Sequence, residues 1–194
     1  SFQAENALAA LALVIGTGAD SAAAVDALGH LRGVLGRAQL VAELSNRAKV
    51  FVDYAHTPDA LSHVLAALRP HTKGRLVVAF GCGGDRDRAK RPEMGRIAAD
   101  LADDVIVTDD NPRDEDPATI RREILVACPD AEDIGNRGRA IARGIDVLQP
   151  GDLLVVAGKG HETYQVFKDS VIPFDDRLEA GRALAAREAG WLHR

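Results

Sequence analysis

Two runs of five apolar residues, Leu76–Phe80 and Leu153–Ala157, constrain the fold of this chain more than any other feature. A strand in which every side chain is apolar has no face for solvent, so other elements must cover both of its faces. Shorter apolar runs occur at Val50–Val52 and Val105–Thr108. Since continuously apolar strands are typical of parallel sheets enclosed by helices, these runs predict an α/β fold.

Segments of helical character lie between these runs. They are expected at about 58–68, 92–102, 117–127 and 137–148, with a last helix near 176–189. Pro58, Pro92 and Pro117 stand where first helical turns should begin, a position at which the missing N–H of proline costs nothing. A weaker strand near 131–134 and a terminal hairpin over 164–174 are also expected. The pattern predicts a Rossmann-like, mostly parallel sheet with helices on both faces.

The first part of the chain has a purely helical pattern. Residues 3–15 are rich in Ala and Leu and run into Gly16, which is typical of a helix that glycine terminates. Ser21 is expected to cap a second helix over about 22–31.

A polar stretch from Gly36 to Lys49 shows little periodicity and separates the two patterns. The sequence opens with Ser1 and enters a helical pattern at once, which suggests a piece of a longer chain. We therefore expect residues 1–38 to be the end of an upstream domain and residues 39–194 to form a domain of their own.

Composition argues against several classes of partner. The net charge of -5, from 24 Lys+Arg against 29 Asp+Glu, does not favour a polyanion-binding surface, and 4% aromatic residues are too few to stack single-stranded nucleic acid. The apolar stretch from Leu8 to Ile15 is short of the roughly 20 residues of a membrane span, and the acidic Glu5 precedes it. Cys82 and Cys128 provide no disulfide framework. We expect a cytoplasmic protein that binds neither nucleic acid nor membranes.

The most polar and glycine-rich segments directly follow the expected strands. They are Asp53–Pro58, Gly81–Arg88, Asp109–Asp114 and Gly158–Glu162. Each of them alone could be a structural turn. Because ligands of parallel sheets bind beyond the carboxyl ends of the strands, the four together predict one shared site.

Generic site motifs are mostly absent from these segments. The sequence contains no G-x-x-x-x-G-K-[ST] phosphate-binding loop. His161-Glu162 is not a zinc-protease motif, since Gln165 stands where the second His must be. Gly81-x-Gly83 lacks the third glycine of the dinucleotide fingerprint, so a nucleotide-dependent redox domain is a weak alternative.

Cys82 and Arg88 have the C-x5-R spacing of a phosphatase loop. Asp85 and Asp87 lie inside that loop and would repel a phosphate. Cys82 is therefore expected to be a small, partly buried residue rather than a nucleophile.

Taken together, four segments resemble the Mur ligases of peptidoglycan synthesis. They read Asp53-Tyr54-Ala55-His56-Thr57-Pro58, Phe80-Gly81-Cys82-Gly83-Gly84-Asp85-Arg86-Asp87, Asp110-Asn111-Pro112-Arg113 and Gly158-Lys159-Gly160-His161-Glu162. Phe2–Ala10 and Gly36-Arg37 resemble the end of the central ATP-binding domain of that family. The resemblance implies a protein of three domains whose phosphate-binding loop, Mg2+ ligands and modified lysine lie upstream. This chain alone is then expected to be inactive.

Within the family, the resemblance is greatest to members that add meso-2,6-diaminopimelate to UDP-N-acetylmuramoyl-L-alanyl-D-glutamate with ATP. It implies that the third domain supplies the amino acid and closes over the nucleotide. The implied diaminopimelate-binding residues are Arg86, Asp110, Asn111, Pro112, Arg113, Gly158 and Glu162.

Structural alternatives to these roles stay open. Arg113 is implied to clamp the distal carboxylate, which a planar guanidinium suits well, but an ion pair with an aspartate of its own loop is the alternative. The same holds for Arg86, the second implied clamp. Glu162 and the carbonyl of Gly158 are implied to accept from the ammonium, whereas a solvated Glu162 is the alternative.

For ATP and Mg2+, the cofactors of the full-length enzyme, the resemblance implies contacts of Asn6, Arg37, Asp53 and His56 with the nucleotide. Asn6 as a plain helix-start residue and His56 as a brace for its turn are the alternatives. Lys159 could reach a phosphate or be solvated. A stand-alone module that captures a zwitterionic amino acid is the remaining alternative for the whole chain.

Overall fold

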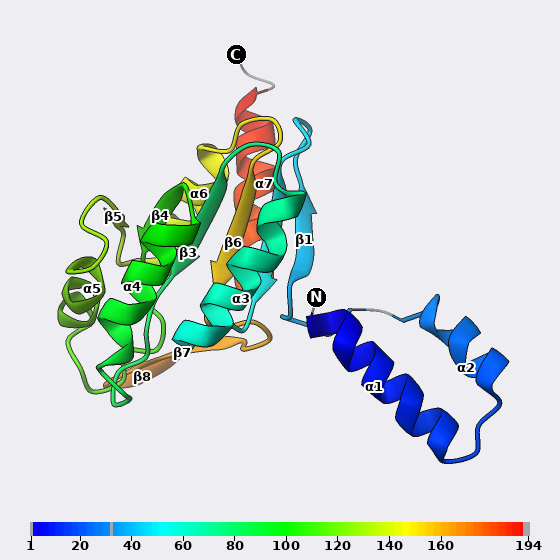
Figure 1. Ribbon diagram of the computed structural model, residues 1–194. Helices are drawn as coiled ribbons and strands as arrows, with labels where there is room; N and C mark the ends of the chain where they lie inside the picture. The colour runs from blue at the N-terminus through cyan, green and yellow to red at the C-terminus, as the bar shows by residue number, and fades with distance from the viewer. Residues whose placement is uncertain (1, 32, 192–194) are drawn as a thin grey trace. The chain divides into compact units, whose positions relative to one another are not determined.

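The computed structural model describes residues 2–31 and 33–191, and the chain divides into two compact units between Val34 and Leu35 (Figure 1). The first unit consists of helices α1 (Phe2–Gly16) and α2 (Ser21–Leu28), which contact each other. The expected break between them is present, since Gly18 has a φ of 97°.

The start of α2 differs from the expectation. Asp20, rather than Ser21, caps the helix, because its side chain accepts a hydrogen bond of 2.8 Å from the backbone N–H of Ala23. Ser21 is the first helical residue, and the helix ends at Leu28, earlier than predicted. Both Asp and Ser are favoured caps, so residue type alone does not choose between two neighbours.

The second unit is built on a six-stranded sheet with the strand order β1-β2-β6-β3-β4-β5. The strands are β1 (Gln39–Glu43), β2 (Lys49–Asp53), β3 (Leu76–Phe80), β4 (Asp104–Val107), β5 (Glu132–Asp133) and β6 (Leu153–Ala157). All neighbours are parallel except β1 and β2. The Rossmann-like, mostly parallel sheet is thus confirmed.

Strand β1 lies in a stretch whose sequence shows no strand pattern, and the prediction missed it. It forms a hairpin with β2, closed by a hydrogen bond of 2.9 Å from Leu44 N to Ala48 O. Its register shifts between Leu40 and Ala42. Such a bulge breaks the alternation of inward and outward residues by which a half-buried strand is recognised.

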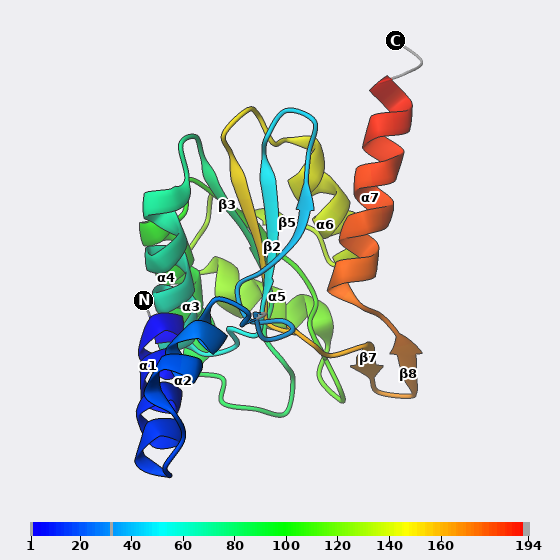
Figure 2. The same cartoon turned by 90° about the vertical axis from the view of Figure 1, so that its right-hand side faces the viewer.

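Helices cover both faces of the sheet. They are α3 (Pro58–Leu68), followed by the short 3-10 helix η1 (Arg69–His71), then α4 (Lys90–Leu101), α5 (Pro117–Leu125), α6 (Arg137–Asp146) and α7 (Asp176–Trp191). Figure 2 shows α3 and α4 on one side of the strands and α6 and α7 on the other. The expected hairpin is formed by β7 (Tyr164–Phe167) and β8 (Ser170–Pro173). No helix in the described ranges is long and apolar enough to cross a membrane.

The hydrophobic core has two layers, one on each face of the sheet. Strand β3 serves both of them: Leu76, Val78 and Phe80 pack with the layer of α3, α4 and α5, whereas Val77 and Ala79 pack with the layer of α6. All five side chains are fully buried. The run Leu76–Phe80 is therefore purely apolar because helices cover both faces of its strand, as inferred from the sequence.

Of the three prolines expected at helix starts, two begin a helix and one lies inside the first turn of another. Pro58 and Pro117 are the first residues of α3 and α5, after the caps Thr57 and Asp116. Pro92 is the third residue of α4, which starts earlier than expected. The first turn of a helix has no internal partners for its N–H groups, so it tolerates proline at all three positions.

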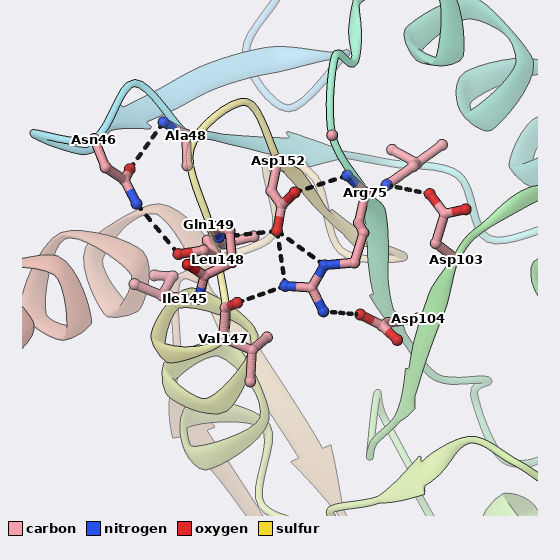
Figure 3. A network of polar contacts seen from close by, with 12 residues as sticks. Asn46, Ala48, Arg75, Asp103, Asp104, Ile145, Val147, Leu148, Gln149 and Asp152 are labelled. Carbon is pink, nitrogen blue, oxygen red and sulfur yellow. Dashed lines mark hydrogen bonds and ion pairs between the residues drawn. The ribbon is translucent and has the colours of Figure 1, made fainter.

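An ionic network closes the amino-terminal edge of the sheet (Figure 3). Arg75 donates to the buried Asp152 at 2.8 Å, to Asp104 at 2.7 Å and to the carbonyl of Val147 at 2.6 Å. Asp103 accepts from the backbone N–H of Leu76. These contacts tie together the starts of β3, β4 and β6, and the polar loops lie at the opposite edge.

Candidate functional site

The carboxyl ends of β2, β3, β4 and β6 open into a cleft of about 660 Å3. Its lining comes from all four polar loops and from the first turns of α3 and α4: Tyr54, His56, Thr57, Pro58, Gly83, Arg86, Asp87, Lys90, Glu93, Asp110, Asn111, Arg113, Gly158 and Glu162. The late strand β6 lies between β2 and β3, and ligands of such doubly wound sheets bind beyond the carboxyl ends of the strands. The structure thus brings the four loops together as predicted.

Glycine allows two of these loops to touch. A Cβ atom on Gly81 would lie 2.1 Å from the carbonyl oxygen of Thr108, and one on Gly84 would lie 1.9 Å from that of Pro112. No larger residue fits at either position without moving the backbone. The loops after β3 and β4 are therefore packed into one surface.

A buried arginine that the sequence analysis missed holds the same two loops. Arg91 pairs with Glu115 at 2.8 Å and with Glu123 at 2.7 Å, and Glu115 also accepts from the backbone N–H of Asp85 at 2.7 Å. The hydrogen bonds from Arg91 lower the pKa of Glu115 to about 2. Arg91 lies on α4 among charged neighbours, so its burial leaves no signal in the sequence.

Arg113 is oriented by carbonyl groups. Its Nη1 donates to the backbone oxygens of Gly84, at 2.9 Å, and Asn111, at 3.3 Å, and its own N–H donates to Val166 in β7. No carboxylate in the described part of the chain forms an ion pair with it, so the alternative of pairing within its own loop is wrong. Nε and Nη2 have no hydrogen-bond partner within the described ranges.

Arg86 lies in the cleft lining on an exposed loop. Its Nη1 donates to the carbonyl oxygen of Asp85 at 2.8 Å, and it forms no ion pair with the carboxylate of Asp85 or Asp87 within the described ranges. The alternative of a salt bridge within the loop is therefore wrong for Arg86 as well.

Asp110 lines the cleft and has one carboxylate oxygen without a donor in the described part of the chain. Its Oδ1 accepts from the backbone N–H of Asn111 at 2.8 Å, whereas the buried Oδ2 has no hydrogen-bond partner within residues 2–31 and 33–191. Gly158, with a φ of 117°, faces this oxygen so closely that a Cβ would lie 2.8 Å from it. A buried carboxylate oxygen without a donor requires one, and a ligand N–H fits that need.

Asn111, Lys159 and Glu162 form one hydrogen-bonded group. The fully buried Lys159 Nζ donates to Asn111 Oδ1 and to Glu162 Oε2, both at 3.0 Å. Asn111 Nδ2 donates to the same Glu162 oxygen at 3.0 Å. Lys159 is therefore neither solvated nor directed at a phosphate, and Glu162 is not a merely solvated charge.

A second missed pair supports the end of β6. Arg137 and Asp176 are both fully buried and joined by two hydrogen bonds of 2.7 Å. Arg137 Nη2 also donates to the carbonyl of Ala157, the residue before Gly158, at 3.0 Å. An Arg at the start of one helix and an Asp at the start of another are common on surfaces, so the sequence does not show that they meet.

Comparison with known proteins identifies the family to which this fold belongs. A family model described as Mur ligase, glutamate ligase domain, matches residues 36–160, which contain three of the four loops and the start of the Gly158–Glu162 loop. The chain belongs to the Mur ligase family.

Relatives of this Mur ligase chain extend well beyond it. The UDP-N-acetylmuramoyl-L-alanyl-D-glutamate–2,6-diaminopimelate ligase of Brucella melitensis is 54% identical over 96% of the chain, and that of Chelativorans sp. is 55% identical over 97%. A solved structure of a ligase with the same name superimposes with a TM-score of 0.75 at 42% identity and covers 96% of the chain. The chain spans 38% and 39% of the two relatives and 39% of the solved chain.

In this Mur ligase domain Asp53 organises the backbone. Its carboxylate accepts from the N–H of Ala55 at 2.7 Å and from that of Ala38 at 2.6 Å. Burial raises its pKa, and it is absent from the cleft lining. Asp53 therefore ties the end of β2 to the chain that enters β1, and each of its oxygens already has a donor.

The remaining residues predicted to contact nucleotide gather around Tyr54 or lie outside the second unit. Arg37 lies over the Tyr54 ring with its Cζ 4.9 Å from the centroid, and the rings of His56 and His161 lie 4.5 and 5.1 Å away. His56 Nδ1 also contacts the carbonyl of Tyr54 at 2.8 Å, which agrees with the alternative of a turn brace. Asn6 is an exposed residue of α1 in the first unit.

Cys82 offers this Mur ligase domain no nucleophile. The side chain is buried, with its sulfur 3.7 Å from that of Met94, and burial raises its pKa to about 12. Arg88, at the phosphatase-like spacing, pairs with Glu123 instead. In the described ranges, no group of three or more His, Cys, Asp or Glu side chains is arranged to hold a metal ion.

Proposed function

We propose that this chain is the amino-acid-binding part of an ATP-dependent ligase that joins meso-2,6-diaminopimelate to UDP-N-acetylmuramoyl-L-alanyl-D-glutamate in the cytoplasm. Support comes from the family and from relatives of more than 50% identity that carry this activity in their names. The Asp110-Asn111-Pro112-Arg113 loop and the Gly158–Glu162 loop line the cleft where that amino acid would bind.

The observation that carries the proposal is that one cleft combines a guanidinium and a carboxylate with unused hydrogen-bonding capacity. Arg113 has Nε and Nη2 free of protein partners in the described ranges, and Asp110 has a buried Oδ2 without a donor. A zwitterionic amino-acid end supplies a carboxylate for the first and an ammonium for the second. A neutral ligand could form hydrogen bonds with both groups but would leave both charges without a counter-charge.

In this arrangement the distal end of diaminopimelate is held and its other end is left to react. Arg113 and Arg86 bind the distal carboxylate, and Asp110, Glu162 and the carbonyl of Gly158 surround the distal ammonium. The second amino group then points out of the cleft as the nucleophile. Holding one end fixes the position of the other, which is how binding lowers the barrier to a reaction between two molecules.

We further propose that residues 1–38 are the end of an ATP-binding domain of the same protein. No described side chain from Ala4 to Val34 is buried, and Leu8, Leu13, Val25 and Leu31 expose 54% to 70% of their surface. Two short helices with so little core need a larger apolar surface to pack on. The length of the relatives beyond this chain supports that reading.

ATP with Mg2+ would supply the phosphoryl group that activates the carboxylate of the nucleotide-linked substrate. Among the residues described, Arg37, Tyr54, His56 and His161 fit one side of such a nucleotide, since they join a guanidinium and imidazoles to an aromatic face. Asp53 fits poorly, because backbone N–H groups take both of its oxygens. The phosphate-binding loop is a contribution of the rest of the protein.

The test is ADP release by the full-length protein with UDP-N-acetylmuramoyl-L-alanyl-D-glutamate and either meso-diaminopimelate or L-lysine. We expect release with the first amino acid, far less with the second, and none from the isolated 194-residue chain. Equal rates with both amino acids would refute the assigned substrate. Diaminopimelate binding with no ADP release under any condition would favour the stand-alone binding module, which the location of the whole cleft in the second unit makes possible.

A further inference from the structure

Lys159 is a fully buried cation next to the cleft that the proposed mechanism does not use. None of its surface is exposed, and its Nζ lies 5.7 Å from the centroid of the Tyr164 ring. An ammonium group enclosed in this way is costly unless it is paired. Both of its hydrogen-bond partners, Asn111 Oδ1 and Glu162 Oε2, belong to residues of the amino-acid site.

We propose that Lys159 is a positioning residue for the amino-acid site, which fixes the carboxylate of Glu162 so that Oε1 faces the ligand ammonium. This inference rests on the proposed function. Lys159 itself lies outside the cleft lining, so it acts on the ligand through Glu162.

The hydrogen bonds around Glu162 explain how this positioning works. Its Oε2 accepts from Lys159 Nζ and from Asn111 Nδ2, both at 3.0 Å, so two donors from different directions hold one oxygen. No hydrogen bond to Oε1 is found in the described part of the chain. A carboxylate locked through one oxygen presents the other in a fixed direction, which preorganises it for a cation.

Charge balance leads to the same conclusion. Glu162 and Asp110 both border the place assigned to the ligand ammonium, and Lys159 neutralises Glu162 directly. The buried Arg137 is committed to Asp176 by two hydrogen bonds. The Lys159–Glu162 pair thus keeps two neighbouring carboxylates from repelling each other, while Asp110 Oδ2 stays without a donor of its own.

Asn111 has a separate anchor, which makes the inference testable. Its Oδ1 also accepts from the backbone N–H of Val166 at 3.0 Å. Without Lys159, Asn111 therefore keeps its orientation, whereas Glu162 loses its charged donor and retains one neutral donor. The expected defect is a loosened Glu162 and not a collapsed loop.

The experiment compares Lys159→Met with Lys168→Met in the full-length enzyme. Met fills the volume of the lysine stem, and Lys168 is an exposed lysine of the β7–β8 turn that serves as the matched control for charge. We expect Lys159→Met to raise the KM for diaminopimelate roughly ten- to a hundredfold, as expected for loss of a charged hydrogen bond. The KM for ATP should change by less than about twofold, since uniform binding of the nucleotide is untouched.

Glu162→Gln alone and combined with Lys159→Met separates positioning from general damage. If Lys159 acts through Glu162, the Lys159→Met penalty on the KM for diaminopimelate should largely vanish in the Glu162→Gln background. The double variant also leaves no unpaired carboxylate, so it remains informative if the single variant folds poorly. Additive penalties, or an unchanged KM for diaminopimelate in Lys159→Met, would overturn the inference alone. A wild-type enzyme that releases no ADP with diaminopimelate would overturn the proposed function and the inference with it.

Discussion

Replacing Arg113 by Ala should remove the preference for diaminopimelate over lysine. Lysine is diaminopimelate without the distal carboxylate, so only a group that binds that carboxylate can separate them. Arg113 is half-buried and its Nη1 donates to two carbonyl groups, which leaves Nε and Nη2 of the guanidinium for the ligand. Truncating one partner of a buried charge pair costs about 2–5 kcal/mol, and half-burial puts Arg113 near the lower end, at about 2–3 kcal/mol.

This energy corresponds to roughly a thirty- to 150-fold rise in the KM for diaminopimelate. Arg113 has a φ of 53°, and Ala is strained there about as much as Arg, so the backbone cost is the same in both proteins. Arg113→Lys should rescue poorly, because an ammonium cannot reproduce the two parallel hydrogen bonds of a planar guanidinium.

The assay is steady-state ADP release by the full-length enzyme with each amino acid, and Arg96→Ala, at an exposed residue of α4, is the matched control. The KM for ATP should stay unchanged. If Arg113→Ala retained the wild-type ratio of kcat/KM for diaminopimelate over lysine, Arg113 would not be the specificity residue.

Three further outcomes are expected. Hydrogen exchange followed by mass spectrometry should show that the backbone amides of residues 4–31 exchange much faster than those of β6, because no described side chain of residues 4–31 is buried. Equal protection of the two segments would contradict the inference that the first unit has an incomplete core. Cys82, with its pKa raised to about 12, should react slowly with thiol reagents at pH 8 in the folded chain and rapidly in urea, and fast labelling of the folded chain would argue against its burial. The pairing of Glu115 with Arg91 lowers the pKa of Glu115 from 4.5 to about 2, so its contribution to stability is complete above pH 4.5 and is lost as the pH falls toward 2. The difference in unfolding free energy between wild type and Glu115→Gln should accordingly shrink over that pH range, and a constant difference would exclude this pair as its source.

The fold was predictable where burial of a segment requires an unbroken run of apolar residues. The runs Leu76–Phe80 and Leu153–Ala157 required covered faces, and the structure covers them. Strand β1 was not predictable, because its bulge disrupts the alternation and one of its edges is free of the sheet. The cap of α2 was not predictable either. Asp20 and Ser21 are adjacent and both favourable, and only the backbone conformation determines which of them caps the helix.

For the site, the sequence predicted which loops meet but not what each side chain contacts. Arg86 and Arg113 lie in the cleft as expected, and their roles as carboxylate clamps stay predictions. Asp53 illustrates the limit: the resemblance implied a nucleotide contact, which stays a prediction, but gave no sign that two backbone N–H groups bond to its oxygens. Lys159, Arg91 and Arg137 were beyond prediction, since charged residues usually lie at the surface and their burial depends on partners distant in the chain.

The four loops of the cleft follow four different strands, and β2 and β6 are neighbours in the sheet although a hundred residues separate them in the chain. No single loop or pair of consecutive loops therefore carries the whole site. The amino acid can bind the complete site only where β2 has paired with β6, β6 with β3, and β3 with β4. Binding then stabilises the entire domain against unfolding rather than one loop, by an amount that grows with the logarithm of ligand concentration. Bound amino acid is therefore expected to slow proteolysis at every site of the domain, including sites distant from the cleft.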